Sequence, residues 1–307
     1  MPEPLSNPIN AATRYCGVYG HPVKHSASPA MQNAGIAALG LNWRYLAFDV
    51  HPNDLASAIA GAKAMKYIGL NLTIPHKLLA LGMVEVLDKS AQVWGAVNTI
   101  RFESKNNQGD WVPLAEIPAG EVSEIQARGF NTDADAITRS LKEDLDIDLK
   151  NSSVLLLGAG GAGRVAALKL AADGVANLFL VNRTRQKADE IAAEIQSTYG
   201  QCKVEVGIPK TSVNLLINAT SLGLKASDPS PLDGTGFQLS NARAVYDMIY
   251  RPAETPLLTA AKFAGCRTAN GIGMLLYQGA KALELWSGRA APINVMRRAL
   301  EENVYGK

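Results

Sequence analysis

Short runs of apolar and β-branched residues alternate along the chain with segments in which apolar positions recur every three or four residues. The runs are typical of buried strands and the segments of amphipathic helices. In the first part of the chain, this pattern predicts strands over residues 15–19, 45–50, 67–73 and 97–102 and a helix over 54–65. Ser28 and Pro29 predict the N-cap and first residue of another helix, and Pro75 opens a helix with Lys77 in its first turn. The polar stretch 103–128, with turn-forming residues at 106–109, predicts a surface hairpin or loop.

The second part of the chain has a more regular pattern. A strand over 154–157, a helix over 162–172 and a strand over 178–182 form one βαβ unit of about 30 residues. Then follow a helix near 187–199, strands over 203–206, 215–218 and 244–248, a helix capped by Thr255, and helices over 274–286 and near 293–302. The alternation predicts an α/β fold with mostly parallel sheets, and the length of 307 residues predicts two domains.

Composition and charge exclude several classes of protein. Apolar residues make up 47% of the chain, and 30 basic against 28 acidic side chains leave a net charge of +2, which offers nucleic acid no attractive surface. The first ten residues lack the pattern of a secretory leader, and no apolar run reaches the roughly 20 residues of a membrane span. Cys16, Cys202 and Cys266 are too scattered for a disulfide framework or a zinc site. We therefore expect a cytoplasmic protein with no membrane partner and no built-in metal.

A glycine-rich loop predicts a dinucleotide site. The loop follows the apolar strand at 154–157 and opens an alanine-rich helix, so that backbone N–H groups at the helix N-terminus can face a pyrophosphate. The alternative, a glycine turn that binds nothing, does not require this strand–loop–helix context. The loop residues are Gly158, Ala159, Gly160, Gly161, Ala162 and Gly163.

The segment after the next predicted strand indicates which dinucleotide is bound. An acidic residue at this place bonds the ribose 2′-hydroxyl of NAD, and here the sequence reads NRTRQK over residues 182–187, with three cations and no carboxylate. Cations suit the 2′-phosphate of NADP, and the planar group of Arg183 can also stack on adenine. The alternative is an exposed basic helix start, which the helix dipole disfavours. The sequence therefore predicts NADP, with Asn182, Arg183, Thr184 and Lys187 as binding residues.

Polar side chains in the first half lie at or just beyond the ends of predicted strands. They are Ser26, Ser28, Thr73, Lys77, Asn98 and Asp133. Strand ends form the ligand crevice of open α/β sheets, and these groups would suit a small polyhydroxylated acid. Singly, each has a structural explanation: Ser28 as a helix cap, Asn98 as a turn residue, Lys77 as a solvated charge.

Nine motifs in order along the chain resemble those of the shikimate dehydrogenase family. They are HPVKHSASPAMQN, NLTIPHK, GAVNTI, GFNTDADA, GAGGAG, NRT, NATSLGL, YDMIYRPAETPLL and GIGMLLYQG. The resemblance implies an N-terminal α/β substrate domain completed by the C-terminal helices, and a central Rossmann-type NADP domain, with the active site in the cleft between them. We expect the first over residues 1–133 plus 272–307 and the second over 134–271.

The resemblance also implies the roles of individual residues. Lys77 and Asp133 would be catalytic, and the substrate would be bound by Ser26, Ser28, Thr73, Asn98, Tyr250 and Gln278. The cofactor would be bound by residues 158–163 and 182–187, with Thr220, Met248, Gly271 and Met274 near the nicotinamide. The implied reaction is reversible NADPH-dependent reduction of 3-dehydroshikimate to shikimate, a step in the biosynthesis of chorismate and the aromatic amino acids. Either Lys77 or Asp133 could be the formal proton donor.

Three features depart from the family pattern. His76 stands where phenylalanine or tyrosine is usual, and we expect its ring to pack with an exposed edge rather than to alter the pKa of Lys77. The segment 103–128 is longer than usual and could cover the site, contact another subunit or only connect. Asp135 replaces a small residue and is expected to begin a helix as a favourable charge.

Two other functions fit the same motifs. A quinate or dual quinate/shikimate dehydrogenase shares every catalytic residue, and the sequence does not reveal the pocket volume that would separate the substrates. The pair Ser26 and Ser28 contains no threonine, which favours shikimate as the substrate. The cationic segment 182–187 favours NADP as the cofactor. A non-enzymatic NADPH-binding regulator should have lost Lys77 or Asp133, and both are present. Both a monomer and a homodimer remain open.

Overall fold

The computed structural model describes residues 9–225 and 227–306. The predicted absence of a secretory leader rests mainly on residues 1–8, which lie outside this part. The chain forms two compact units: one contains the residues up to Thr132 and those from Leu276 onward, and the other contains Asp133–Leu275. The chain therefore passes from one unit to the other twice, the second time inside a helix.

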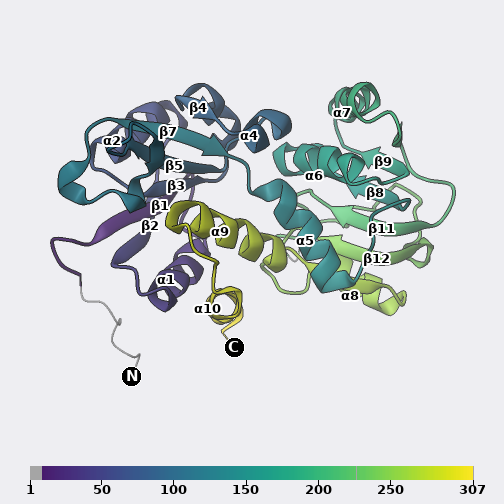
Figure 1. Ribbon diagram of the computed structural model, residues 1–307. Coiled ribbons are helices and arrows are strands. Elements are labelled where there is room, and N and C mark those ends of the chain that lie inside the picture. The colour runs from purple at the N-terminus through teal and green to yellow at the C-terminus, as the bar shows by residue number, and fades with distance from the viewer. Residues whose placement is uncertain (1–8, 226, 307) are drawn as a thin grey trace. The chain divides into compact units, whose positions relative to one another are not determined.

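The first unit is built on a mixed sheet (Figure 1). Its strands are β1 (Arg14–Gly20), β2 (Trp43–Asp49), β3 (Gly69–Leu72), β4 (Val86–Leu87), β5 (Thr99–Lys105), β6 (Trp111–Pro113) and β7 (Ile125–Phe130), in the order β2-β1-β3-β5-β7-β4, with β6 beside β5. β1 runs parallel to β2 and β3, whereas β5 runs antiparallel to β3 and β7. The α-helices are α1 (Ser28–Ala38), α2 (Leu55–Ala64), α3 (His76–Leu79), α4 (Lys89–Trp94), the C-terminal part of α9 (Ile272–Ser287) and α10 (Ile293–Tyr305).

The C-terminal helices complete the core of this unit. α10 packs along α1, and the fully buried Trp286 of α9 donates from its indole nitrogen to the backbone oxygen of Ile100 at 3.0 Å. Gly69 leaves room for this indole, because a Cβ at that position would overlap its ring nitrogen. Gln32 of α1, also fully buried, donates to the backbone oxygen of Gly279 at 2.8 Å. The first 132 residues therefore do not fill their own core.

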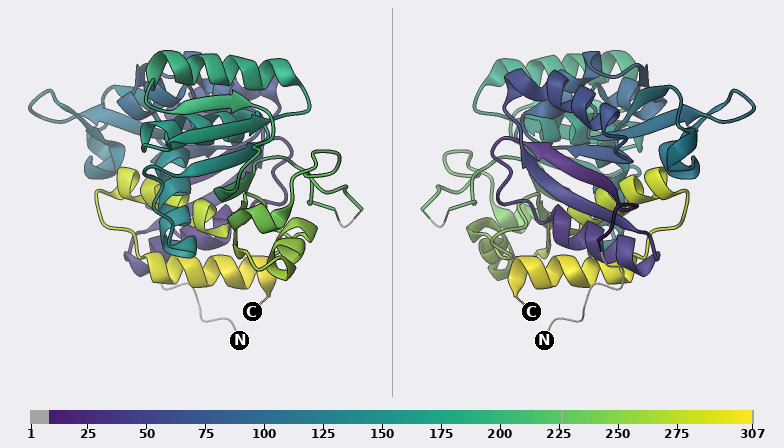
Figure 2. Two further views of the ribbon diagram at one scale, coloured as in Figure 1. Left: turned by 90° about the vertical axis from the view of Figure 1, so that its right-hand side faces the viewer. Right: turned by 90° about the vertical axis from the view of Figure 1, so that its left-hand side faces the viewer.

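The second unit has a six-stranded parallel sheet, which can be followed in the left view of Figure 2. Its strands are β8 (Ser153–Leu157), β9 (Asn177–Val181), β10 (Lys203–Val206), β11 (Val213–Asn218), β12 (Ala242–Asp247) and β13 (Arg267–Asn270), in the order β10-β9-β8-β11-β12-β13. Its helices are α5 (Asp133–Leu145), α6 (Gly161–Ala172), α7 (Arg185–Thr198), α8 (Pro256–Phe263) and the start of α9. The strand order reverses direction between the neighbouring strands β8 and β11. This order is that of a doubly wound dinucleotide-binding fold.

The structure confirms the α/β class and corrects several local predictions. Ser28 is the first residue of α1 and not its N-cap, which is Ala27 without a side-chain cap bond, whereas Thr255 caps α8 as predicted. The segment 103–128 contains a hairpin, as predicted, because β6 pairs antiparallel with β5 and the turn between them projects from the unit (Figure 2), but it also begins with fully buried Glu103 and ends in β7, which was not expected. β4, β7, β13 and α4 were not predicted. Asp135 lies in the first turn of α5, as expected, and pairs with Lys169 at 3.1 Å.

Candidate functional site

One edge of the first sheet gathers most of the predicted substrate residues. β1 and β3 are parallel, so their carboxyl ends, followed by His21 and Thr73, lie at the same edge. β5 is antiparallel to β3 with Asn71 opposite Thr99, so Asn98, which precedes β5, reaches that edge from the other direction. The sequence analysis placed Asn98 near the start of a predicted strand over 97–102, without the direction of that strand. The antiparallel register, which no local pattern encodes, is what brings it to the site.

The two serines lie between β1 and α1. Ser26 is half-buried and donates its backbone N–H to the oxygen of Val23 at 2.9 Å, and its hydroxyl oxygen lies 3.4 Å from the N–H of Ser28. Ser28 is only 7% exposed, at the first turn of α1. Hydroxyl groups beside the N-terminus of an 11-residue helix can donate hydrogen bonds to a carboxylate without an arginine.

The segment from Thr73 to Lys77 is held by backbone hydrogen bonds. Thr73 donates to the oxygen of Tyr19 at 2.9 Å, and its own oxygen accepts from the N–H of His76 at 2.8 Å. The oxygen of Lys77 accepts from the N–H of Val97 at 2.8 Å, which ties α3 to the chain before Asn98. Lys77 is half-buried, on a backbone segment held by these hydrogen bonds.

His76 is fully buried, with no exposed edge, which corrects that part of the prediction. Neither ring nitrogen has a hydrogen-bond partner among the described residues. Burial lowers the pKa of His76; the nearby backbone of Val50 acts in the opposite direction, and the His21 ring adds to the lowering. The imidazole is therefore a neutral, buried packing group on the first residue of α3, the helix that carries Lys77.

The remaining predicted substrate and catalytic residues belong to other elements. Gln278 is half-buried on the part of α9 that belongs to the first unit. Asp133 is 6% exposed and is the first residue of α5, while Tyr250 follows β12; both belong to the second unit. Burial raises the pKa of Tyr250, and Arg251 acts in the opposite direction. The predicted set is thus shared by both units.

The glycine loop of the second unit has room for a phosphate. Gly158 has a left-handed φ of +105°, and a Cβ at Gly163 would overlap the Gly158 oxygen, so these two glycines are needed for the turn and for close packing. A Cβ at Gly160 or Gly161 would meet no atom within 4 Å. The loop therefore stays open above the N-terminus of α6, where a pyrophosphate fits.

The basic segment 182–187 follows β9 and contacts this loop through Asn182. Asn182 accepts from the N–H of Ala159 at 3.0 Å and donates to the oxygen of Thr184 at 2.8 Å, so its side chain fixes the segment against the glycine loop. Arg183 and Lys187 are exposed, and neither has an ion-pair partner within residues 9–225 and 227–306. Two free cations beside an open phosphate loop fit the additional phosphate of NADP.

A buried polar network orders the predicted nicotinamide side. Asn218 accepts from the hydroxyl group of Thr220 at 2.7 Å and donates to Asp247 at 3.0 Å, and Asp247 accepts from the hydroxyl of Thr255 at 2.6 Å. Burial raises the pKa of Asp247, although these hydrogen bonds act in the opposite direction. The sequence analysis missed Asn218 and Asp247 as site-forming residues. The only available signal was their position at the ends of adjacent strands.

Met248, Gly271 and Met274 follow the same strand ends. Met248 donates its N–H to the oxygen of Asn218 at 2.9 Å, and Gly271 lies so close to the Met248 backbone that a Cβ would overlap it. Met274 is half-buried in the first turn of α9. All three predicted residues therefore lie along the chain segments that leave the carboxyl ends of β12 and β13.

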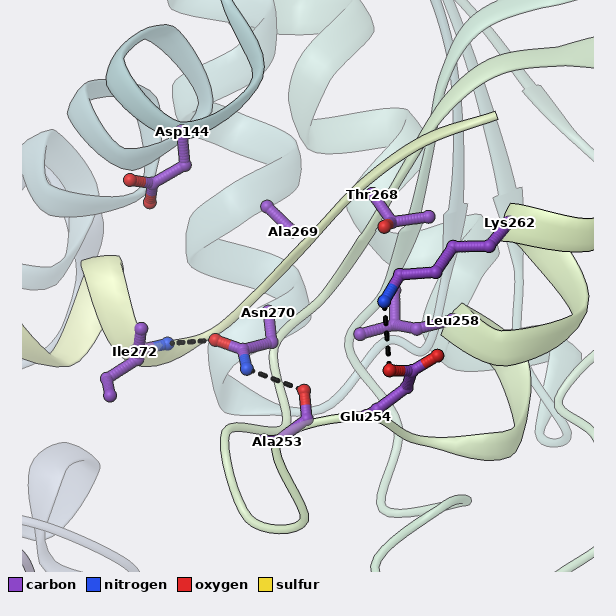
Figure 3. Close-up of a pocket in the computed structure, with 9 residues that line it drawn as sticks. All are labelled: Asp144, Ala253, Glu254, Leu258, Lys262, Thr268, Ala269, Asn270 and Ile272. Atoms are coloured by element: carbon purple, nitrogen blue, oxygen red, sulfur yellow. Dashed lines mark hydrogen bonds and ion pairs between the residues drawn. The ribbon is translucent and has the colours of Figure 1, made fainter. Parts of the chain in front are cut away.

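A separate pocket of about 290 Å³ lies beside β13 in the second unit (Figure 3). Lys262 donates to Glu254 at 2.9 Å, Asn270 donates to the oxygen of Ala253 at 2.7 Å, and Asp144 lies on the opposite side. None of the predicted substrate or cofactor residues lines it. Its polar groups are largely bonded to one another, so we assign it no ligand.

The described part of the chain offers neither a membrane-spanning helix nor a metal cluster. No helix in that part of the chain is both long and apolar enough to cross a membrane. Residues 9–225 and 227–306 also contain no group of three histidine, cysteine or acidic side chains placed to hold a metal ion.

Family models match three parts of the chain. Residues 18–100 match the shikimate dehydrogenase substrate binding domain, residues 139–221 match shikimate / quinate 5-dehydrogenase, and residues 271–301 match the shikimate 5'-dehydrogenase C-terminal domain. The first range contains the serines, Lys77 and Asn98, and the second contains the glycine loop.

Relatives and solved structures match almost the whole chain. A shikimate dehydrogenase (NADP(+)) of Methanopyrus kandleri is 38% identical over 98% of this chain and 99% of its own. A crystal structure of a shikimate dehydrogenase in complex with NADP+ is 37% identical, covers 98% of this chain and 99% of its own, and has a TM-score of 0.82. The Thermus thermophilus enzyme in complex with NADP(H) and shikimate is 32% identical over 94% of this chain and 99% of its own, with a TM-score of 0.77. On fold, motifs and full-length similarity together, the chain belongs to the shikimate dehydrogenase family.

Proposed function

We propose that the protein catalyses the reversible NADPH-dependent reduction of 3-dehydroshikimate to shikimate. The observation that carries the proposal is the gathering of Ser26, Ser28, Thr73, Lys77 and Asn98 at one sheet edge, in a chain that also has an open phosphate loop. The relatives named above favour shikimate over quinate. We assign the substrate domain to residues 1–133 plus 272–307 and the NADP domain to 134–271, close to the two units of the structure.

The residues of this chain have separable roles in that reaction. NADPH, when bound, supplies the hydride. The hydroxyl groups of Ser26 and Ser28 hold the substrate carboxylate, and Asn98 and Thr73 hold ring oxygens. The ammonium group of Lys77 stabilises negative charge as it develops on the substrate oxygen, and Lys77 or Asp133 donates the proton to that oxygen. Tyr250 and Gln278 complete the substrate contacts.

Cofactor choice rests on two exposed cations. Arg183 and Lys187 bind the 2′-phosphate, since they are free of ion pairs among the described residues and lie next to the glycine loop. Replacing either with glutamine should raise the KM for NADP+ by roughly tenfold, the effect of losing one charge-assisted hydrogen bond. The KM for NAD+ should not change. Lys203→Gln, an exposed lysine of β10, serves as the control.

The substrate is tested by initial rates of reduced-nicotinamide formation with shikimate and quinate, each paired with NADP+ and NAD+. We expect shikimate with NADP+ to be preferred and Lys77→Ala to abolish turnover, while the exposed Lys89→Ala does not. Efficient quinate turnover with NAD+ would contradict the proposal and place the enzyme in the quinate branch. Tight NADPH binding without turnover of either acid would favour a regulator.

Two coarser properties complete the proposal. We place the reaction in the cytoplasm, because all three cysteines are buried free thiols, as in proteins of reducing compartments. We expect a monomer or a homodimer in solution. Light scattering coupled to size exclusion distinguishes these two states.

A further inference from the structure

Tyr45 is a buried side chain of the first unit that has no assigned role. It lies on β2, is 0% exposed, and donates its hydroxyl proton to Oδ1 of Asn71 on β3 at 2.8 Å. Burial, reinforced by the Cys16 thiol, raises the pKa of the Tyr45 phenol well above its usual value, while the facing Ser28 hydroxyl lowers it. The phenol therefore remains a hydrogen-bond donor throughout the working pH range of an enzyme.

Asn71 connects Tyr45 to the next strand, β5, because its amide accepts on one side and donates on the other. Its Nδ2 lies 3.4 Å from the backbone oxygen of Asn98, which can only accept, so the amide nitrogen faces β5 and its oxygen faces Tyr45. The same Nδ2 donates to Oγ1 of Thr99 at 3.0 Å. Because that oxygen accepts here, the single hydroxyl proton of Thr99 can donate to Oδ1 of Asn98 at 3.2 Å or to Oγ1 of Thr132 at 3.3 Å, and both of these atoms take part in the hydrogen bonds of Asn98.

Asn98 ends this chain of hydrogen bonds, and it is one of the proposed substrate residues. Its Oδ1 also accepts from the N–H of Thr132 at 2.8 Å, and its Nδ2 donates one proton to Oγ1 of Thr132 at 3.0 Å. The second Nδ2 proton has no acceptor in the described part of the chain. Asn98 is therefore presented to the site as a donor, with its carbonyl oxygen already saturated.

We propose that Tyr45 is a positioning residue: its hydroxyl, through two intervening side chains, holds the Asn98 amide so that the nitrogen donates to a substrate hydroxyl oxygen. This inference rests on the proposed function, which assigns Asn98 to the substrate. Without the phenol, the buried Oδ1 of Asn71 has no donor among the described residues, and the amide is oriented only by the longer contact of 3.4 Å to the Asn98 backbone oxygen and by Thr99 itself, so the relay is held less tightly. Buried networks of this kind transmit such losses, since each member depends on its neighbour for orientation.

The test is Tyr45→Phe, which removes one oxygen atom. We expect the KM for shikimate to rise about tenfold, the effect of one disrupted hydrogen bond to substrate, with kcat within about twofold. The KM for NADP+ should stay the same, because the proposed cofactor residues lie in the second unit. Tyr19→Phe is the matched control: Tyr19 is 4% exposed and donates to the oxygen of Ala58 at 3.4 Å, away from this network.

Thr99→Val provides a second, independent interruption of the same relay with little change in volume, and should reproduce the rise in KM. Two shikimate analogues, each lacking one of the non-reacting hydroxyl groups, then identify the substrate oxygen that Asn98 binds. With the analogue that lacks this oxygen, Tyr45→Phe and the wild type should have equal KM values. If both variants bind shikimate as Tyr19→Phe does, the inference is wrong. If the wild-type enzyme does not oxidise shikimate at all, the proposed function fails and the inference falls with it.

Discussion

His76→Phe should make the first unit more stable. His76 is fully buried, and neither ring nitrogen has a hydrogen-bond partner among the described residues. A buried polar group without a partner costs about 1–3 kcal/mol, and phenylalanine removes both nitrogens at once. The phenyl ring is larger than imidazole, and the strain of fitting it into the packed core costs about 1 kcal/mol. The expected net gain is about 0–2 kcal/mol, or up to roughly 8 °C in Tm for a domain of this size.

The gain should also grow as the pH falls. Burial lowers the pKa of His76 in the folded state from its ordinary value of 6.5. Between the folded and unfolded pKa values, the unfolded chain binds more protons than the folded one, so the wild type is fully stabilised above pH 6.5 and loses stability below it. The phenylalanine variant has no such proton uptake.

Differential scanning calorimetry at pH 7.5 and pH 5.5 measures both effects. Separate transitions for the two units would show directly which one shifts. His25→Phe is the control, since His25 is exposed and its ring is already solvated. A His76→Phe variant that is less stable than the wild type, by an amount that does not depend on pH, would refute the reasoning.

Three further substitutions test other parts of the structure. Gly163→Ala should destabilise the second unit by about 1–3 kcal/mol in thermal melts, because its Cβ would overlap backbone, whereas Gly160→Ala should leave Tm unchanged and weaken dinucleotide binding measured by fluorescence titration. Glu103→Gln should cost about 3–5 kcal/mol in urea unfolding, because this fully buried carboxylate bonds two arginines; an equally stable variant would contradict that role. Asp88→Ala should cost about 1 kcal/mol at pH 7, since Asp88 caps α4 at the N–H of Ser90. Burial raises the Asp88 pKa, but the hydrogen bonds from Ser90 outweigh it and lower the pKa overall, so the wild-type advantage should disappear as the pH falls below about 4.

Hydrophobic periodicity predicted the elements of the second unit better than those of the first. β8, β9 and β11 each contain a short apolar run, because the central strands of a parallel sheet are buried on both faces. β4 has only two residues, and β13 reads RTAN, so neither has an apolar pattern to detect. β7 reads IQARGF and was missed because Gln126 and Arg128, which bond the buried Glu103 of β5, give it the pattern of a solvent-exposed segment.

Most candidate site residues could be found through sequence motifs, but their positions relative to one another depend on the direction and register in which the strands pair. Ser26, Thr73 and Lys77 follow parallel strands, so their common edge could be anticipated. Asn98 reaches the same edge only because β5 is antiparallel to β3. The buried hydrogen bonds of Asn71 and Asp247 depend on neighbouring strands, and no sequence period records which side chains meet across a sheet.

The return of the chain to its first unit has a consequence for synthesis. The second unit is a continuous stretch, Asp133–Leu275, so all of its strands are available for folding once that stretch has left the ribosome. The first unit must wait for Trp286 and α10, which fill its core more than 150 residues after β5 has been made. Until then, its sheet exposes apolar surface that only the C-terminus can cover. The last residues to be translated thus decide when the first-made half becomes a stable domain, and a premature stop before Trp286 would leave that half incomplete beside a folded neighbour.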